Sequence, residues 1–143
     1  MTLHERTQAL EKQYIQILKE WEQETDLSSI SLKIPKYVAP FQFHLRSLFV
    51  EYSNLQDQLD QIFHDSVIEY KMQMSELSNF TFNASELKRM IETSKEHREI
   101  KKQQDEISND MKLIEDIIKT MQNQSFNISN AIKWQAFISG ENI

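Results

Sequence analysis

The sequence predicts an all-α fold in which long amphipathic helices pack as a coiled coil or helical bundle. Only one glycine and two prolines occur among 143 residues, and sheets and tight turns usually need more of both. Apolar residues also recur at alternating steps of three and four along most of the chain, which is the period of a helical seam. This length favours one helical domain, residues 1–143, with a modest core.

Two helices are predicted in the first half of the chain. The first covers residues 2–24 and the second covers residues 41–74. The seam of the second consists of Phe41, Leu45, Leu48, Tyr52, Leu55, Leu59 and Ile62. Between the helices, residues 25–39 are expected to form a connector, because Pro35 and Pro40 disfavour helical geometry in the residues before them. Pro40 also suits the first turn of a new helix.

The third predicted helix covers residues 85–139 and follows a turn over residues 77–85. A break is expected at Thr93, because its spacing to Glu96 fits a capping box. The seam consists of His97, Ile100, Gln104, Ile107, Met111, Ile114, Ile118, Met121, Ser125, Ile128 and Ile132. A seam on the order of 60 Å long exceeds what a domain of this size can bury. Part of it is therefore expected to find its partner in another subunit.

The residues needed for most enzymatic chemistry are missing. The absence of cysteine removes disulfides, thiolate metal sites and thiol catalysis. The four histidines lie on different segments without metal-ligand spacing, and the single glycine, Gly140, excludes glycine-rich phosphate loops. Gln104 and Ser125, the polar residues of the seam, are expected to fix helix register. The sequence thus predicts no catalytic residue, no metal, no cofactor and no enzyme.

The balance of charge limits the partners of the protein. A formal net charge of -6 means that the chain cannot coat nucleic acid or anionic lipid over its whole surface. No apolar run approaches the roughly 18 residues of a membrane span, and the first residues lack the apolar core of a signal peptide. A cytoplasmic protein without membrane contact is expected, and any nucleic-acid binding must use a local patch.

Charges are segregated around the third predicted helix. With Gln104 and Met111 at the first heptad position, the outward second and sixth positions hold six cations and two acids, Asp105 and Asp116, which leaves +4. The cations are Lys95, Arg98, Lys102, Lys112, Lys119 and Lys133. The third and seventh positions instead collect Glu92, Glu96, Glu99, Glu106 and Asp110. Cations repeated on a rigid face can follow a nucleic-acid backbone, with Lys88 and Arg89 extending the track, although any coiled coil carries charges outside.

The last predicted helix ends in a wide apolar surface. This surface consists of Ile128, Ile132, Trp134, Phe137 and Ile138. Gly140 follows it at a position that fits a helix C-cap. Burial of apolar surface contributes roughly 25 cal/mol per Å², so residues 127–139 are predicted to dock on another subunit as an oligomerisation segment.

Short motifs follow one another along most of the chain. They are Glu20-Trp21-Glu22, Ile34-Pro35, Ser85-Glu86-Leu87-Lys88, Ile91-Glu92-Thr93-Ser94 and the closing pattern Ile128-x-x-Ala131-Ile132-x-Trp134-x-x-Phe137-x-x-Gly140. In this order they resemble the UvsY family of phage recombination mediators, and the closing pattern is the most specific part.

The resemblance implies a non-catalytic helical protein that forms ring-like homo-oligomers of six or seven subunits and binds single-stranded DNA. Such proteins load a phage RecA-like recombinase onto DNA covered by the phage single-strand-binding protein, in the host cell cytoplasm, and need their C-terminal helix for assembly. The best-known member places its DNA-contacting cations before the central turn, where this chain offers only Lys71 and His64. Either the track lies on the third helix, or the number of subunits supplies the affinity.

These arguments together predict a recombination mediator on single-stranded DNA. The predicted DNA-binding residues are Lys71, Lys88, Arg89, Lys95, Arg98, Lys102 and Lys112. The alternative is a structural coiled-coil adaptor that touches no nucleic acid, which the net charge of -6 favours. Salt separates the two, because phosphate binding releases counterions and weakens steeply as salt rises.

Overall fold

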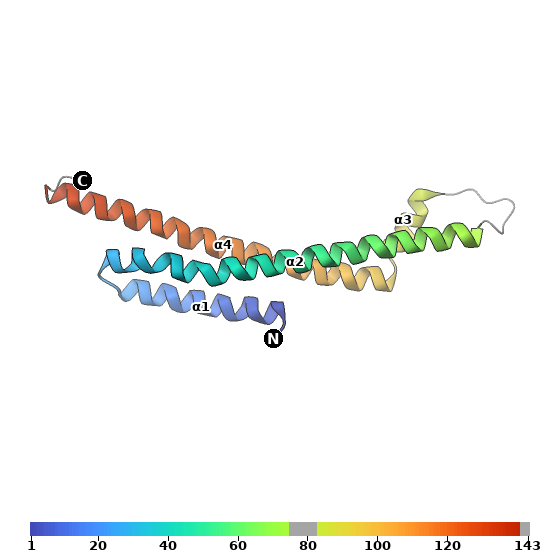
Figure 1. Ribbon diagram of the computed structural model, residues 1–143, viewed down its shortest axis with the longest axis horizontal. Helices are drawn as coiled ribbons and strands as arrows, with labels where there is room; N and C mark the ends of the chain where they lie inside the picture. Colours follow the sequence, from blue (N-terminus) through green and yellow to red (C-terminus); the bar gives the residue numbers. More distant parts are fainter. Residues whose placement is uncertain (75–82, 141–143) are drawn as a thin grey trace. The chain divides into compact units, whose positions relative to one another are not determined.

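The computed structural model describes residues 1–74 and 83–140. Within them the chain forms helices and no strand, in the order α1 (Leu3–Gln23), α2 (Leu27–Met74), α3 (Ala84–Glu92) and α4 (Lys95–Ile138) (Figure 1). The all-α fold class is thereby confirmed. Most of the turn predicted over residues 77–85 lies outside the described residues. None of the described helices combines the length and the apolar character that crossing a membrane requires.

Helix α1 has nearly the predicted bounds because its start is capped and one face is apolar. The Thr2 hydroxyl accepts a hydrogen bond from the backbone N–H of Glu5 at 3.1 Å, which satisfies one of the free donors at the helix start. Leu10 and Ile17, both on the predicted stripe, are each 3% exposed. The stripe therefore forms the inner face of α1.

The connector predicted over residues 25–39 is wrong, because α2 begins at Leu27 and runs through both Pro35 and Pro40. A proline in a helix interior removes one hydrogen bond and costs about 3 kcal/mol. Burial of the apolar face opposes that cost. Four side chains around the prolines are at most 5% exposed: Ile30, Ile34, Val38 and Phe41. At about 1.5–3 kcal/mol each, their burial offsets the cost of two prolines.

The chain divides into two compact units, and α2 and α4 contribute to both. Unit 1 (Met1–Leu48 and Asn109–Ile143) packs α1, the first part of α2 and the last part of α4 side by side (Figure 1). Its fully buried side chains include Phe41, Leu48, Ile114 and Met121. Unit 2 (Phe49–Ser108) contains α3 and the remainder of the long helices around Leu55, Leu59, Leu87, Ile91 and Ile107. The single domain over residues 1–143 stays a prediction.

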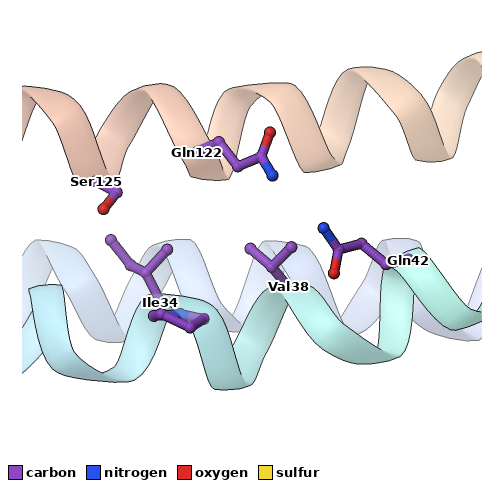
Figure 2. A pocket seen from close by; sticks show the side chains of 6 residues that line it. Ile34, Val38, Gln42, Gln122 and Ser125 are labelled. Carbon is purple, nitrogen blue, oxygen red and sulfur yellow. The ribbon is translucent and has the colours of Figure 1, made fainter.

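The seam of α4 finds most of its partners inside the chain, and the pairing of its remaining part with another subunit stays a prediction. Its buried members include Ile107, Ile114, Ile118, Met121 and Ile128. The reason is the length of α2, which supplies a partner where a connector was expected. Figure 2 shows this in unit 1, where Ile34 and Val38 of α2 face Gln122 and Ser125 of α4 across a shallow hollow.

Polar side chains occupy part of the core of unit 1. The ring Nδ1 of His4 lies 3.0 and 3.1 Å from the two carboxylate oxygens of Asp110, and the Thr7 hydroxyl lies 2.8 Å from Nε2 of His44. The other acids at the third and seventh heptad positions of the third predicted helix are exposed. Asp110 is only 5% exposed, because α1 brings His4 against it. Burial and the nearby Arg6 lower the pKa of the His44 imidazole below its usual range, while Asp110 opposes the shift.

Among the residues of unit 2 that the structure describes, the fully buried polar side chain is Gln104. Its amide nitrogen donates to the side-chain oxygen of Gln56 on α2 at 2.9 Å, and its own oxygen accepts from Lys101 at 3.1 Å. A bond between α2 and α4 at one position of the seam is the arrangement expected of a residue that fixes register.

Candidate nucleic-acid interface

Helix α3 presents two cations because its opposite face is anchored in unit 2. Asn83 caps the helix, and its side-chain oxygen accepts two backbone N–H groups at 3.1 and 3.2 Å. Leu87 and Ile91, one turn apart, are 5% and 4% exposed. Lys88 and Arg89 therefore lie on the solvent side.

The break predicted at Thr93 is confirmed, although the capping residue is Ser94. The Thr93 hydroxyl donates to the carbonyl of Arg89 at 2.9 Å, whereas the Ser94 hydroxyl oxygen accepts the backbone N–H of His97 at 3.3 Å. Helix α4 therefore begins at Lys95. Because of this break, α4 has its own N-terminus at Lys95, and the positive end of its helix dipole lies beside the cations of its first turns.

A shallow hollow of about 490 Å³ lies at the start of α4 in unit 2. Its lining consists of Glu92, His97, Arg98, Lys101, Lys102 and Asp105. Three exposed cations and two acids thus line the same hollow, which gives it a formal charge of +1. We call Arg98, Lys101 and Lys102 the α4 cation group.

The acids of this hollow are paired with lysines of their own helices. Nζ of Lys88 lies 3.9 Å from the carboxylate of Glu92, and Nζ of Lys101 lies 3.5 Å from Asp105. Among the described residues, Arg98 forms no ion pair, and neither does Lys102. Their charges therefore remain available to an anion from solution.

His97 lines the same hollow, and one of its ring nitrogens is unsatisfied. Its Nδ1 is buried and has no hydrogen-bond partner among the described residues, although the sequence placed it on an apolar seam. A buried ring nitrogen without a partner costs free energy.

All seven predicted DNA-binding residues are exposed, but the structure gathers only some of them. Arg98 and Lys102 line the hollow, and Lys95 lies one turn before Arg98. Lys88 and Arg89 lie on α3 and Lys71 on the last turn of α2, all in unit 2. Lys112 belongs to unit 1.

Lys101 is the cation of the hollow that the sequence prediction missed. It occupies the fifth heptad position, beside the seam, and only the second and sixth positions were considered outward. Its spacing of three residues from Arg98 was the available signal, because residues three apart are neighbours on a helix surface. The described residues contain no group of histidines and acids that could hold a metal ion.

Comparison with known families decides what kind of protein carries this site. A family model described as "Recombination, repair and ssDNA binding protein UvsY" matches residues 10–141. The chain belongs to the UvsY family. The match covers every predicted DNA-binding residue and the closing aromatic pattern. The family description names binding of single-stranded DNA and no catalysed reaction. No curated protein and no solved structure matches this chain.

The closing pattern of this UvsY-family chain divides between core and surface. Ile128 is 3% exposed and Ile132 is half-buried, since both lie on the inner side of α4 in unit 1. Trp134, Phe137 and Ile138 are 62%, 70% and 67% exposed, and the two aromatic rings stack with centroids 5.7 Å apart. We call these three residues the tail cluster.

The helix stops directly after the tail cluster. Gly140 adopts a positive φ of 75°, which only glycine adopts at little cost, and its N–H donates to the carbonyl of Phe137 at 3.2 Å. The predicted C-cap is confirmed. It ends α4 with the exposed aromatic residues held in the last helical turns.

Proposed function

We propose that this protein is a recombination mediator that binds single-stranded DNA through the α4 cation group and promotes loading of a phage RecA-like recombinase in place of the single-strand-binding protein. One observation carries the proposal: three cations gather in a hollow beside a buried, unsatisfied histidine nitrogen in an otherwise acidic chain. The family description supports the nucleic acid it names. Lys71, Lys88, Arg89, Lys95 and Lys112 extend the contact surface in this proposal.

The proposed mechanism is linkage and needs no active site. A protein that binds one state of a strand more tightly shifts the equilibrium toward that state. If it holds the strand in a form that the recombinase accepts, it lowers the cost of displacing the single-strand-binding protein. Each exposed cation contributes little alone, so the effect depends on several contacts to one strand.

Assembly through the tail cluster multiplies those contacts. Trp134, Phe137 and Ile138 expose aromatic and aliphatic area that a second copy would bury. A ring of six or seven copies, working in the host cytoplasm, would present as many α4 cation groups to one strand. Ile132 borders this surface, while Ile128 supports it from the core.

The experiment compares two double variants of the full chain. Arg98→Gln with Lys102→Gln removes two cations of the hollow, and Lys12→Gln with Lys19→Gln removes two exposed lysines of α1 as the matched control. Binding of a labelled poly-thymidine strand is followed by fluorescence anisotropy across salt concentrations. The hollow variant should bind more weakly, with a salt slope lower by about 1.4, since each lost phosphate contact on a single strand changes it by about 0.7.

Equal binding by the two variants would contradict the assignment of the hollow. Loading is measured separately, as the rate at which a RecA-like recombinase assembles on strand covered by single-strand-binding protein. The wild type should speed this assembly and the hollow variant should not. If the wild type binds no DNA even at low salt, the structural adaptor becomes the better account of the chain.

A further inference from the structure

The first half of α2 differs from the rest of the chain in charge. Residues 27–50 contain Lys33, Lys36 and Arg46 and no aspartate or glutamate. This segment therefore carries +3, while the remainder of the protein carries -9. None of these three cations forms an ion pair within the described part of the chain.

Two of the cations share an outward face of α2 with exposed apolar side chains. At steps of four, three, four and three, the face consists of Leu32, Lys36, Ala39, Phe43 and Arg46, and all five are exposed. We call it the α2 outer stripe. It lies in unit 1, on the side of the helix opposite to the buried Ile34 and Phe41.

The core of unit 1 does not explain this stripe. Phe43 is 69% exposed and Leu32 is 82% exposed, although both belong to a helix whose other face is closely packed. Lys36 lies two turns before Phe43 and Arg46 one turn after it, so the two cations are about 15 Å apart along the helix axis. An exposed aromatic ring is thus flanked by two cations.

Single-stranded DNA has the chemistry that this arrangement fits. Its bases offer flat faces that stack on aromatic rings, and phosphates lie on both sides of each base. A purely apolar protein partner would have to cover Lys36 and Arg46 and leave them without counter-charges, which is costly. Duplex DNA keeps its bases inside the stack, so it would use the cations and leave Phe43 without a partner.

We infer that the α2 outer stripe is a second contact surface for single-stranded DNA, with Phe43 stacking on a base and Lys36 and Arg46 binding the flanking phosphates. This inference rests on the proposed function and adds a surface that is separate from the α4 cation group. It also assigns base stacking to a residue in unit 1, whereas the α4 cation group of unit 2 provides charge.

The test separates stacking from charge by using two variants with different expected signatures. Phe43→Ala should weaken binding of poly-thymidine by about tenfold, the effect of losing one stacked base, and should leave the salt slope unchanged. Lys36→Gln with Arg46→Gln should lower the slope by about 1.4. Phe43→Trp should retain the wild-type affinity, because the indole also stacks.

Matched controls come from α1 of the same unit. Ile15→Ala removes another exposed apolar side chain, 48% exposed, and Lys12→Gln with Lys19→Gln removes two exposed lysines. Both controls should bind like the wild type. Photo-crosslinking to a strand that contains 5-bromouracil should in addition label Phe43, as read by mass spectrometry.

Three outcomes would overturn the inference. Wild-type binding by the Phe43→Ala variant would show that the ring does not stack. A lower oligomer mass of that variant in sedimentation would assign the stripe to a contact between copies. If the wild type itself binds no single-stranded DNA, the proposed function fails together with the inference, whereas the first two outcomes leave the α4 cation group standing.

Discussion

The two units bury polar side chains of different kinds. In unit 1 the buried groups are titratable, because His44 and Asp110 are 1% and 5% exposed. In the described part of unit 2 the fully buried polar group is Gln104, a neutral amide at 0% exposure. The same two helices, α2 and α4, carry these residues in both units.

Helix α1 accounts for the difference. It brings His4 to Asp110 and Thr7 to His44, so that ionisable side chains are held by hydrogen bonds inside unit 1. The hydroxyl proton of Thr7 goes to the carbonyl of Leu3 at 3.1 Å, which leaves its oxygen to accept an Nε2–H of His44. In unit 2 an amide pair joins the helices and has no charge to lose. A change of pH should therefore alter the stability of unit 1, whose buried side chains can gain or lose a proton. The buried amide of Gln104 in unit 2 should contribute no such dependence.

The largest effect is expected at Asp110. Asp110→Ala removes a buried carboxylate that His4 contacts through both oxygens, and hydrogen bonds to charged groups are worth about 1.5–3 kcal/mol. The free energy of unfolding should fall by about that amount in urea titrations. Glu99→Ala, an exposed acid of α4, is the control and should change little. A wild-type midpoint for the Asp110 variant would contradict the role of this pair.

Acidification is expected to give the next largest effect. Burial first, and the charge of Arg6 second, lower the pKa of folded His44, while Asp110 opposes them. The unfolded chain then binds a proton more readily than the folded one, so this contribution is intact above the ordinary pKa of 6.5 and is lost as pH falls below it toward the lowered value. Melting temperatures should fall between pH 7.5 and 5, and His44→Gln should flatten that fall. Parallel profiles of the variant and the wild type would exclude His44 as the cause.

A smaller effect is expected at Gln104. Gln104→Leu removes the buried amide, while its partner Gln56 is exposed and can bond to water, so the free energy of unfolding should change by less than about 1 kcal/mol. Gln56→Ala should cost more, because it leaves the buried amide nitrogen without its partner. Neither change should alter the pH profile. If Gln104→Leu costs more than Gln56→Ala, Gln104 stabilises the core by more than its hydrogen bond to Gln56.

The smallest effect is expected at the surface pair of Lys88 and Glu92. The two side chains are 65% and 50% exposed and lie 3.9 Å apart, and such pairs contribute about 0.3–0.5 kcal/mol. Lys88→Gln should therefore leave the urea midpoint almost unchanged. Any loss of DNA affinity in this variant would then report a lost contact, whereas a large loss of stability would show that α3 depends on the pair.

The sequence predicted the helices better than the connections between them. The three- and four-residue steps located α1, most of α2 and most of α4, because burial of one helix face follows that period directly. The connector was wrong because Pro35 and Pro40 were judged by local geometry alone. The apolar steps through Ile30, Ile34 and Val38 were present in the sequence and outweigh the prolines only when α2 meets its partners.

The candidate site was partly predictable for a similar reason. Arg98 and Lys102 follow from their outward heptad positions, and Trp134 and Phe137 follow from the apolar tail. The burial of Asp110 depends on α1, more than a hundred residues away in the sequence, and no local pattern reports such a contact.

The most direct test of the account is the affinity of the unmodified protein for a labelled poly-thymidine strand of about 30 nucleotides, measured by fluorescence anisotropy over a series of salt concentrations. If local cations of this acidic chain bind the strand, the logarithm of the affinity should fall linearly with the logarithm of salt, by about 0.7 per phosphate contacted. An affinity that does not change with salt, or no binding at low salt, would contradict the claim that exposed cations make this protein a binder of single-stranded DNA.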